Sequence, residues 1–296
     1  AADYIAVSHI DPQDFITTDA SPWVGTDGLD RELTTYDQAS GVREGKYVGI
    51  FYHTWHAGHA WNKLVNVQKL VEQYPEAIKG YKHSAWGNAT ICFWNEPIYG
   101  YYNNGVDRYV LRKQAELLAD AGVDVVFFDN TNGTENYMQA ILTLCEVWAE
   151  ARADGVKTPQ ISCMLNMYEY KDTARQLIEL YDVIYAKGLY QDLWFYWDGK
   201  PLVMITGDFP MSDEARNFFS IRYSWAFGVT NWYSDRNGIN CWPWNASWPQ
   251  VPGYGDSRED LEQTVVMCGF GATVGRSLLS NRMPRLDRGQ PWDFGF

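Results

Sequence analysis

Short apolar runs alternate with helical segments along most of this chain. Each run is nearly continuous, which is typical of strands that are buried on both faces. The runs predict strands over Tyr47–Tyr52, Thr90–Phe93, Val123–Phe128, Ile161–Leu165, Pro201–Ile205, Ile221–Phe227 and Thr264–Cys268. Between them, apolar residues at helical spacing predict helices over Asp107–Ala121, Glu135–Ala151, Ala174–Tyr181 and Ser212–Phe219.

This alternation predicts an α/β fold with a parallel sheet, because right-handed helical crossovers join parallel strands. We expect a (β/α)8 TIM-type barrel over residues 46–296, a length near the usual size of that fold. No G-x-G-x-x-G or P-loop motif follows a strand, so an open nucleotide-binding sheet is disfavoured. The runs give seven strands where a barrel needs eight. Either Val183–Tyr185 is the missing strand or the last βα unit is missing from the chain.

Two segments depart from the strand–helix pattern. Residues 1–45 lack clean periodicity and contain several turn signals, so we expect an irregular N-terminal segment that wraps the same domain. Residues 228–258 are rich in Trp, Pro, Gly and Asn and predict a long aromatic loop. A loop of this length inside a compact domain is often a substrate-binding element.

Aromatic residues make up 16% of the chain. Many lie in polar surroundings, where they suit the apolar faces and hydroxyl edges of sugar rings. Packing of long loops is the alternative explanation. The formal net charge of −13 argues against nucleic acid as a partner. Since no apolar run reaches the length of a membrane span, we expect no membrane insertion.

Cysteine content and the first residues bear on the compartment. The five Cys form no CxxC pair, and an odd number gives no disulfide framework. Those within apolar runs are expected to behave as small hydrophobes. The chain begins Ala-Ala-Asp without Met, as after removal of a signal peptide, which predicts a secreted or periplasmic protein. We expect no cofactor, and the oligomeric state stays open.

A histidine cluster follows the first predicted strand. His53, His56 and His59 recur at a spacing of three, with Trp55 between them. On one helical turn such a set can hold a metal ion. The Gly58 break and the aromatic setting favour hydrogen bonds to sugar hydroxyls instead. A purely structural role of the three histidines is the third hypothesis.

Carboxylates follow the second and third predicted strands. Asn95-Glu96-Pro97 looks like the signature of clan A glycoside hydrolases, where the Glu is the general acid/base. Aromatic neighbours, including Tyr101, would raise the pKa of Glu96 by desolvation, as a general acid requires. Asp129 and Asn130 end the apolar run Val123–Phe128. A carboxylate there is costly unless it reaches a solvated cleft or finds partners.

Later strand ends supply further polar and aromatic residues. Asn166, Trp225 and Trp232 are expected to bind substrate, and Asp208 and Asp235 are reserve carboxylates. Asp208 can equally cap the helix that follows it. Glycoside cleavage needs two facing carboxylates, and their separation, which decides between retention and inversion, stays open. No Gly-x-Ser-x-Gly elbow or Cys/His pair stands out, which disfavours serine or thiol hydrolysis.

Part of the chain resembles a known group of barrel proteins. Lys46–Trp55 looks like the first barrel strand of the endo-mannosidase-like and WbsX-like proteins related to glycoside hydrolase families 99 and 71. Gly100–Tyr102 and Val110–Asp129 resemble their second unit. The resemblance implies a barrel that acts on glycans, and the chain also resembles endo-acting enzymes on marine sulfated fucans. Those proteins commonly have aromatic residues where this chain has Asp129-Asn130, so their catalytic residues do not transfer by position.

These observations together predict an endo-acting glycosidase whose substrate is a polysaccharide or oligosaccharide. Glu96 and Asp129 are the expected acid/base and nucleophile or stabiliser, and His53, Trp55, His56, His59, Tyr101, Asn130, Asn166, Trp225 and Trp232 the expected sugar-binding residues. Three rivals remain. They are a non-catalytic carbohydrate-binding barrel, a metal-dependent hydrolase built on the histidines, and a glycosyltransferase-like role that the WbsX-like resemblance alone suggests.

Overall fold

The structure is a computed structural model that describes most, but not all, of the chain. The described residues are 24–39, 41, 43–55, 65–79, 83–86, 93–94, 97–131, 133–166, 170–207, 211–224, 238–243 and 252–265. All structural statements below concern these residues.

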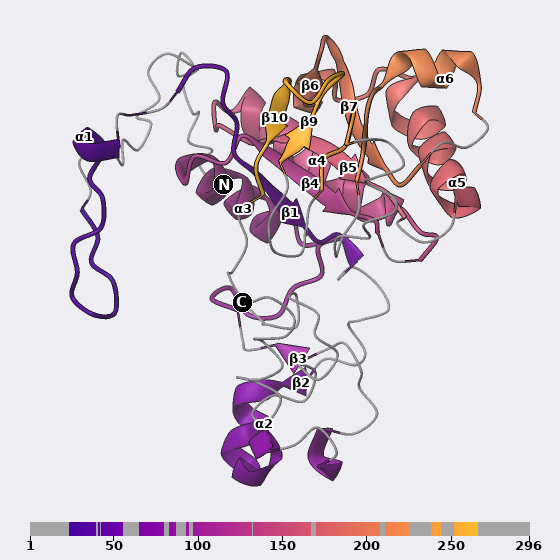
Figure 1. The fold of residues 1–296 in the computed structure, drawn as a ribbon. Coiled ribbons are helices and arrows are strands. Elements are labelled where there is room, and N and C mark those ends of the chain that lie inside the picture. The colour runs from indigo at the N-terminus through magenta and orange to yellow at the C-terminus, as the bar shows by residue number, and fades with distance from the viewer. Residues whose placement is uncertain are drawn as a thin grey trace, which may run out of the picture.

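A six-stranded sheet forms the centre of the protein (Figure 1). Its strands are β1 (Gly49–Tyr52), β4 (Val125–Asp129), β5 (Gln160–Met164), β7 (Lys200–Ile205), β8 (Ser220–Tyr223) and β6 (Tyr196–Trp197). The first five are parallel and lie in chain order across the sheet, and β6 pairs antiparallel with β7. The α/β class with a parallel sheet is therefore confirmed. Closure into a barrel stays a prediction.

Helices connect these parallel strands. They are α3 (Arg108–Asp120), α4 (Met138–Ala153), α5 (Tyr170–Leu180) and α6 (Asp213–Phe218). The predicted start of α3 is confirmed, because the Asp107 carboxylate accepts a hydrogen bond from the Val110 amide at 3.2 Å. Ser212 caps α6 in the same way. The predicted start of α4 at Glu135 is three residues early, because Tyr137 adopts a left-handed conformation directly before the helix.

The two faces of the sheet have different partners. On the helix face, strand residues such as Val126, Phe128 and Val203 pack against buried residues of α3, α4 and α5. On the second face, Val125, Met164 and Met204 pack with Trp242, and no helix residue joins that cluster. All the crossover helices that reach the described core therefore cover one face. Gly49 is required on the second face, because a Cβ there would meet the ring of Phe127.

The apolar stretch Val183–Tyr185 is not the missing strand. It belongs to a π-helical turn, Tyr181–Tyr185, that continues α5 directly. Ile184 and Tyr185 are buried in the helix-face core. Three consecutive apolar residues fit both a strand and a buried helical turn, and here the preceding helix decides between them.

The weak predicted strand Thr90–Phe93 is only partly described. Its described end forms β3 (Phe93–Trp94), which pairs in parallel with β2 (Val65–Asn66) rather than with the central sheet. β2 leads into α2 (Val67–Gln73), and 3-10 turns follow at Pro75–Lys79 and Ser84–Trp86. Figure 1 shows α2, β2 and β3 as a group beside the central sheet. β1 consequently pairs with β4 in the described sheet, with no strand between them.

The N-terminal segment is described from residue 24. It contains a bridge between Thr26 and Glu32 and the short helix α1 (Tyr36–Ala39), and none of residues 24–39 is buried. The prediction that residues 1–45 wrap the domain rests largely on residues outside the described ones.

The predicted aromatic loop contains ordered pairing at its described residues. Cys241 bridges Tyr223 of β8, and β9 (Gly253–Tyr254) pairs with β10 (Leu261–Gln263). Trp242 is buried on the second face of the sheet, which favours the packing explanation for this aromatic residue. Of the predicted strand Thr264–Cys268, the two described residues are not in a strand, and the rest lies outside the described part.

Cys163, which lies in a predicted apolar run, is buried as the sequence predicts, and Cys145 and Cys241 are buried as well. The other two cysteines, Cys92 and Cys268, lie outside the described residues. Burial raises the pKa of Cys163 to about 12, against a smaller opposing effect of a hydrogen bond with Tyr185, so the thiol stays protonated. As for membranes, none of the helices in the described part is long and apolar enough to cross a bilayer.

Candidate functional site

Polar side chains replace apolar ones on the second face where the parallel strands end. β1 and β4 pair in register up to Tyr52 and Phe128, so the next residues, His53 and Asp129, follow side by side. Further along the same edge, Asn166 follows β5, Thr206 follows β7 and Ser224 follows β8. The carboxyl ends of parallel strands are the usual place for active sites in α/β proteins. We call this row of residues the strand-end row.

Asp129 is the carboxylate of the strand-end row. Apolar residues of β4 lead up to it, and its side chain is buried, with 8% of the residue exposed. Its Oδ1 accepts hydrogen bonds from the amide of Thr131 at 3.1 Å and from the Thr131 hydroxyl at 2.6 Å. Within the described residues no donor reaches Oδ2. One oxygen therefore orients the carboxylate while the other is available to a reacting group.

His53 keeps an exposed surface next to Asp129. Desolvation by neighbouring atoms lowers the pKa of its imidazole, and the charge of Asp129 partly opposes this shift. The imidazole is therefore neutral at neutral pH, with one donor and one acceptor nitrogen. The ring of Trp55 lies 5.2 Å from it, tilted by 39°. The structure thus brings two predicted sugar-binding residues together beside the predicted catalytic Asp129.

Asn104 fixes the backbone of His53 and was not predicted from the sequence. Its Nδ2 donates a hydrogen bond to the His53 carbonyl oxygen at 2.6 Å. The residue is 3% exposed, and its buried Oδ1 has no hydrogen-bond partner among the described residues. The signal in the sequence is weak, because Asn103-Asn104-Gly105 is also an ordinary turn sequence.

Asn130 is fully buried directly after Asp129. Its Nδ2 donates to Asn136 Oδ1 at 3.1 Å, and its Oδ1 accepts a long hydrogen bond, 3.5 Å, from the Thr54 hydroxyl. This geometry gives Asn130 a role in positioning the loop after β4. Direct contact of Asn130 with a ligand stays a prediction.

Asn166 connects three strand ends. Its carbonyl oxygen accepts hydrogen bonds from the hydroxyls of Thr206 at 2.7 Å and Thr173 at 2.8 Å. Its amide donates to the Gln176 side chain at 2.8 Å, and its own side chain donates to the carbonyl of Gly133. Asn166 is 2% exposed, so it too holds the strand-end row together. Its predicted contact with substrate is untested.

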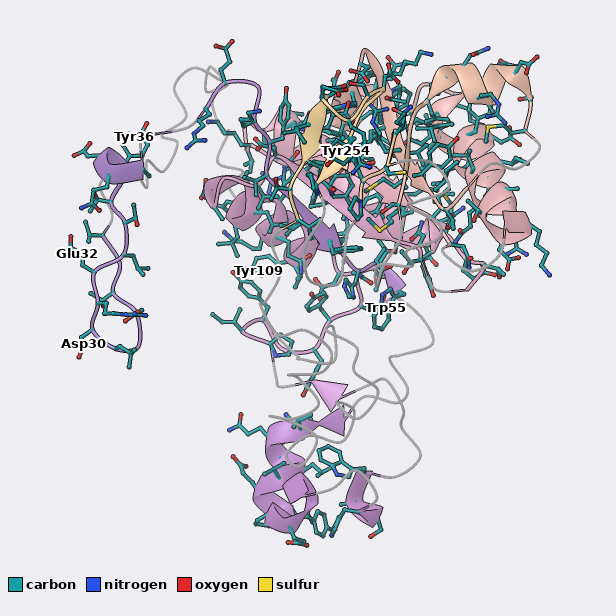
Figure 2. All side chains as sticks on the ribbon, viewed as in Figure 1. Asp30, Glu32, Tyr36, Trp55, Tyr109 and Tyr254 are labelled. Atoms are coloured by element: carbon teal, nitrogen blue, oxygen red, sulfur yellow. The ribbon has the colours of Figure 1, made fainter. Side chains whose placement is uncertain are left out.

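Aromatic residues of the 97–109 segment lie near the start of α3. Tyr101 is half-buried, and Tyr99 is exposed and packs edge-on against exposed Tyr109, with ring centroids 6.0 Å apart. Figure 2 shows Trp55 and Tyr109 on the same side of the central sheet. Because Asn104 of this segment contacts His53, the segment borders the strand-end row.

Several predicted site residues lie outside the described part of the chain. These are Glu96, Asp208, Asp235, His56, His59, Trp225 and Trp232. The predicted carboxylate pair and the predicted histidine cluster are therefore represented only by Asp129 and His53. Among the described residues, no three His, Cys, Asp or Glu side chains gather as a metal site would require.

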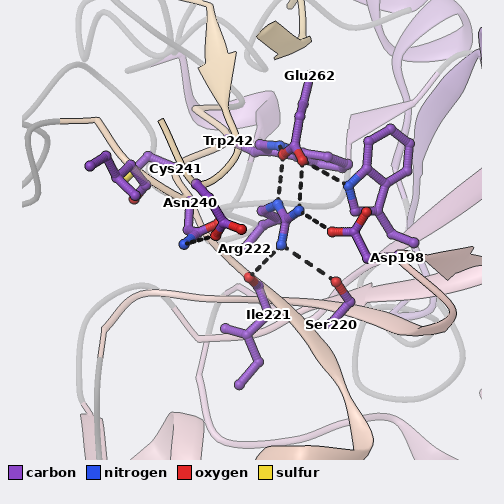
Figure 3. A network of polar contacts seen from close by, with 11 residues as sticks. Asp198, Ser220, Ile221, Arg222, Asn240, Cys241, Trp242 and Glu262 are labelled. Atoms are coloured by element: carbon purple, nitrogen blue, oxygen red, sulfur yellow. Dashed lines mark hydrogen bonds and ion pairs between the residues drawn. The ribbon is translucent and has the colours of Figure 1, made fainter. Parts of the chain in front are cut away.

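A second polar cluster lies on the same face around Arg222, and Figure 3 shows its contacts. The guanidinium pairs with Glu262 of β10 through two hydrogen bonds of 2.7 Å. It also bonds to Asp198, at 2.7 Å, in the turn that precedes β7. The indoles of Trp197 and Trp242 donate to the two oxygens of Glu262. This cluster, the Arg222 cluster, joins β6, β8 and β10.

Comparisons of the chain with protein-family models, with curated proteins and with solved structures gave no match. The geometry of the strand-end row is therefore the basis for a functional assignment.

Proposed function

We propose that this protein is a glycoside hydrolase that cleaves within a polysaccharide chain. The observation that carries the proposal is Asp129, a buried carboxylate at the carboxyl end of a parallel strand. Thr131 orients one of its oxygens, and no described donor reaches the other. Glycosidases require such a carboxylate as nucleophile or base.

Glu96 remains the proposed acid/base partner of Asp129, with Asp208 and Asp235 in reserve. The general acid donates its proton to the glycosidic oxygen as the bond to the sugar breaks. Asp129 stabilises the positive charge that develops on the sugar ring or attacks its anomeric carbon. Neutral His53 beside it is suited to exchange hydrogen bonds with sugar hydroxyls.

The arrangement of the sheet supports closure into a (β/α)8 barrel. Five parallel strands follow chain order, and the packed crossover helices share one face. Open doubly wound sheets reverse their strand order and place helices on both faces. A polymeric substrate too large to cross a membrane would require the enzyme outside the cytoplasm, so we also propose that the protein is secreted or periplasmic.

The test is release of new reducing ends from a panel of neutral, sulfated and uronic polysaccharides. We expect Asp129→Asn and Glu96→Gln each to lower turnover at least about a hundredfold, the low end for a catalytic proton-transfer group. Asp124→Asn is the matched control, because Asp124 precedes the same strand at its opposite end and its Oδ2 accepts from the Val48 amide. Wild-type turnover in Asp129→Asn would refute the assignment.

Two other outcomes identify the rivals. Binding of a polysaccharide without release of reducing ends, by folded protein, would indicate a carbohydrate-binding function. Activity that is lost on chelation and restored by a divalent metal would indicate a metal-dependent hydrolase built around His53.

A further inference from the structure

Gln176 on α5 makes hydrogen bonds to two different strand-end loops. The residue is fully buried, although it has a polar side chain and lies in the middle of a helix. Its Nε2 donates to the carbonyl oxygens of Asn130 at 3.0 Å and Glu135 at 3.2 Å. Its Oε1 accepts from the amide of Asn166 at 2.8 Å. Both amide protons and the carbonyl oxygen of the side chain are therefore used.

The two carbonyls that Gln176 binds are the ends of the segment 130–135. Thr131, which holds Oδ1 of Asp129, lies within this segment. The amide of Gln176 thus closes the segment and fixes the backbone from which Thr131 reaches back to the carboxylate. The side chain of Asn136 reinforces this closure, because its Nδ2 donates to the backbone carbonyl of Gln176 at 2.8 Å.

We propose that Gln176 is a positioning residue for the Asp129 carboxylate. The inference rests on the proposed function for its catalytic meaning. Its structural content, that Gln176 maintains the hydrogen bonds from Thr131 to Asp129, can be tested without a substrate.

The experiment measures amide hydrogen exchange by NMR. The exchange rate of the Thr131 amide is divided by that of the Val126 amide, because Val126 is buried in β4. Gln176→Met keeps the side-chain volume but removes all three side-chain hydrogen bonds. We expect the ratio to rise at least about tenfold, as loss of two neutral hydrogen bonds to one loop would produce. If Gln176 only added global stability, its replacement would speed exchange at the Thr131 and Val126 amides equally. An unchanged ratio would therefore overturn the proposal.

Thr173→Val is the matched control. Thr173 is also fully buried on α5, and its described hydrogen bond goes to the carbonyl of Asn166 rather than to Asn130 or Glu135. We expect this variant to leave the ratio unchanged, and a rise as large as that in Gln176→Met would also overturn the proposal.

A second variant keeps the test decisive if Gln176→Met does not fold. Gln176→Glu retains an acceptor for the Asn166 amide but places its other oxygen against the two carbonyls. It should raise the Thr131 ratio as well, and a folded Gln176→Glu with the wild-type ratio would refute the inference. With a polysaccharide that the wild-type protein cleaves, a folded Gln176→Met or Gln176→Glu variant should have a kcat about tenfold lower, because the catalytic group is misplaced. KM should change little. Failure of the wild-type protein to cleave any polysaccharide would refute the proposed function and leave the exchange result standing.

Discussion

The Arg222 cluster and the strand-end row lie on the same face of the sheet but differ in how completely their polar groups are satisfied. In the Arg222 cluster, a buried cation faces two carboxylates, and two indoles complete the partners of Glu262. In the strand-end row, Asp129 is buried and its described donors reach Oδ1 alone, and its titratable neighbour His53 is neutral at neutral pH.

This difference separates two uses of buried charge. Removing one partner of a buried ion pair leaves the other charge buried and uncompensated, so a fold that contains such a pair depends on both partners. A buried carboxylate that has one oriented oxygen and no described donor on the other can still accept a hydrogen bond from a ligand. We therefore interpret the Arg222 cluster as a structural element and the strand-end row as the proposed catalytic site, and three measurements test this division.

The largest expected effect is on stability at the Arg222 cluster. Arg222→Met leaves Glu262 buried without its cation, which should lower the free energy of unfolding by about 3–5 kcal/mol. The control is Arg108→Met, because Arg108 also meets two carboxylates, Glu146 and Glu150, but at the surface. That change should have a far smaller effect. Equal losses in urea unfolding would contradict the structural role of the buried cluster.

A smaller effect is expected on the pH dependence of stability. Burial alone would raise the pKa of Glu262, but hydrogen bonds from Arg222, Trp197 and Trp242 outweigh it and lower the pKa. A lowered pKa in the folded state stabilises the fold above the unfolded pKa of about 4.3 and loses this contribution as the pH falls through the folded value. Glu262→Gln should therefore make the free energy of unfolding depend less steeply on pH between about pH 5 and pH 3. An unchanged slope would show that Glu262 is not the group responsible.

The smallest expected effect is on the titration of His53. The charge of Asp129 opposes the desolvation that lowers the pKa of His53. Asp129→Asn removes this charge, so the pKa of His53 should fall further. NMR titration of the imidazole measures it, with Asp124→Asn as the variant that should leave the pKa unchanged. A higher pKa in Asp129→Asn would mean that the two side chains do not interact as described.

The strands and helices that the sequence predicted well have strong local signals. Apolar runs gave β4, β5 and β7, and Asp107 gave the start of α3. The start of α6 was also predicted, but Ser212 caps it in the structure, whereas the sequence had suggested Asp208 as a possible cap. The strand β6 was missed because it is only two residues long and pairs with β7 across a tight turn. The turn at Tyr181–Tyr185 was misread because three apolar residues fit a strand as well as a buried helical turn.

Site residues could be predicted from the sequence only where the residue type is unusual for its position. Asp129 stands out because it ends an apolar strand, and His53 because it begins a run of histidines. Gln176 and Asn104 gave no such signal, because uncharged amides on a helix or turn are common at surfaces. Their roles follow from backbone carbonyls that only the fold brings close to them.

The chain-order arrangement of the parallel strands has a consequence for how the protein can change. The parallel strands β1, β4, β5, β7 and β8 have the same order across the sheet as along the chain. Each segment that follows a strand therefore forms one sector of the rim, meaning the edge of the sheet at the carboxyl ends of the strands. A substitution or insertion after β8 alters one end of this rim without disturbing the sector that holds Asp129. The scaffold can therefore acquire new ligand preferences sector by sector while its proposed reactive carboxylate stays in place.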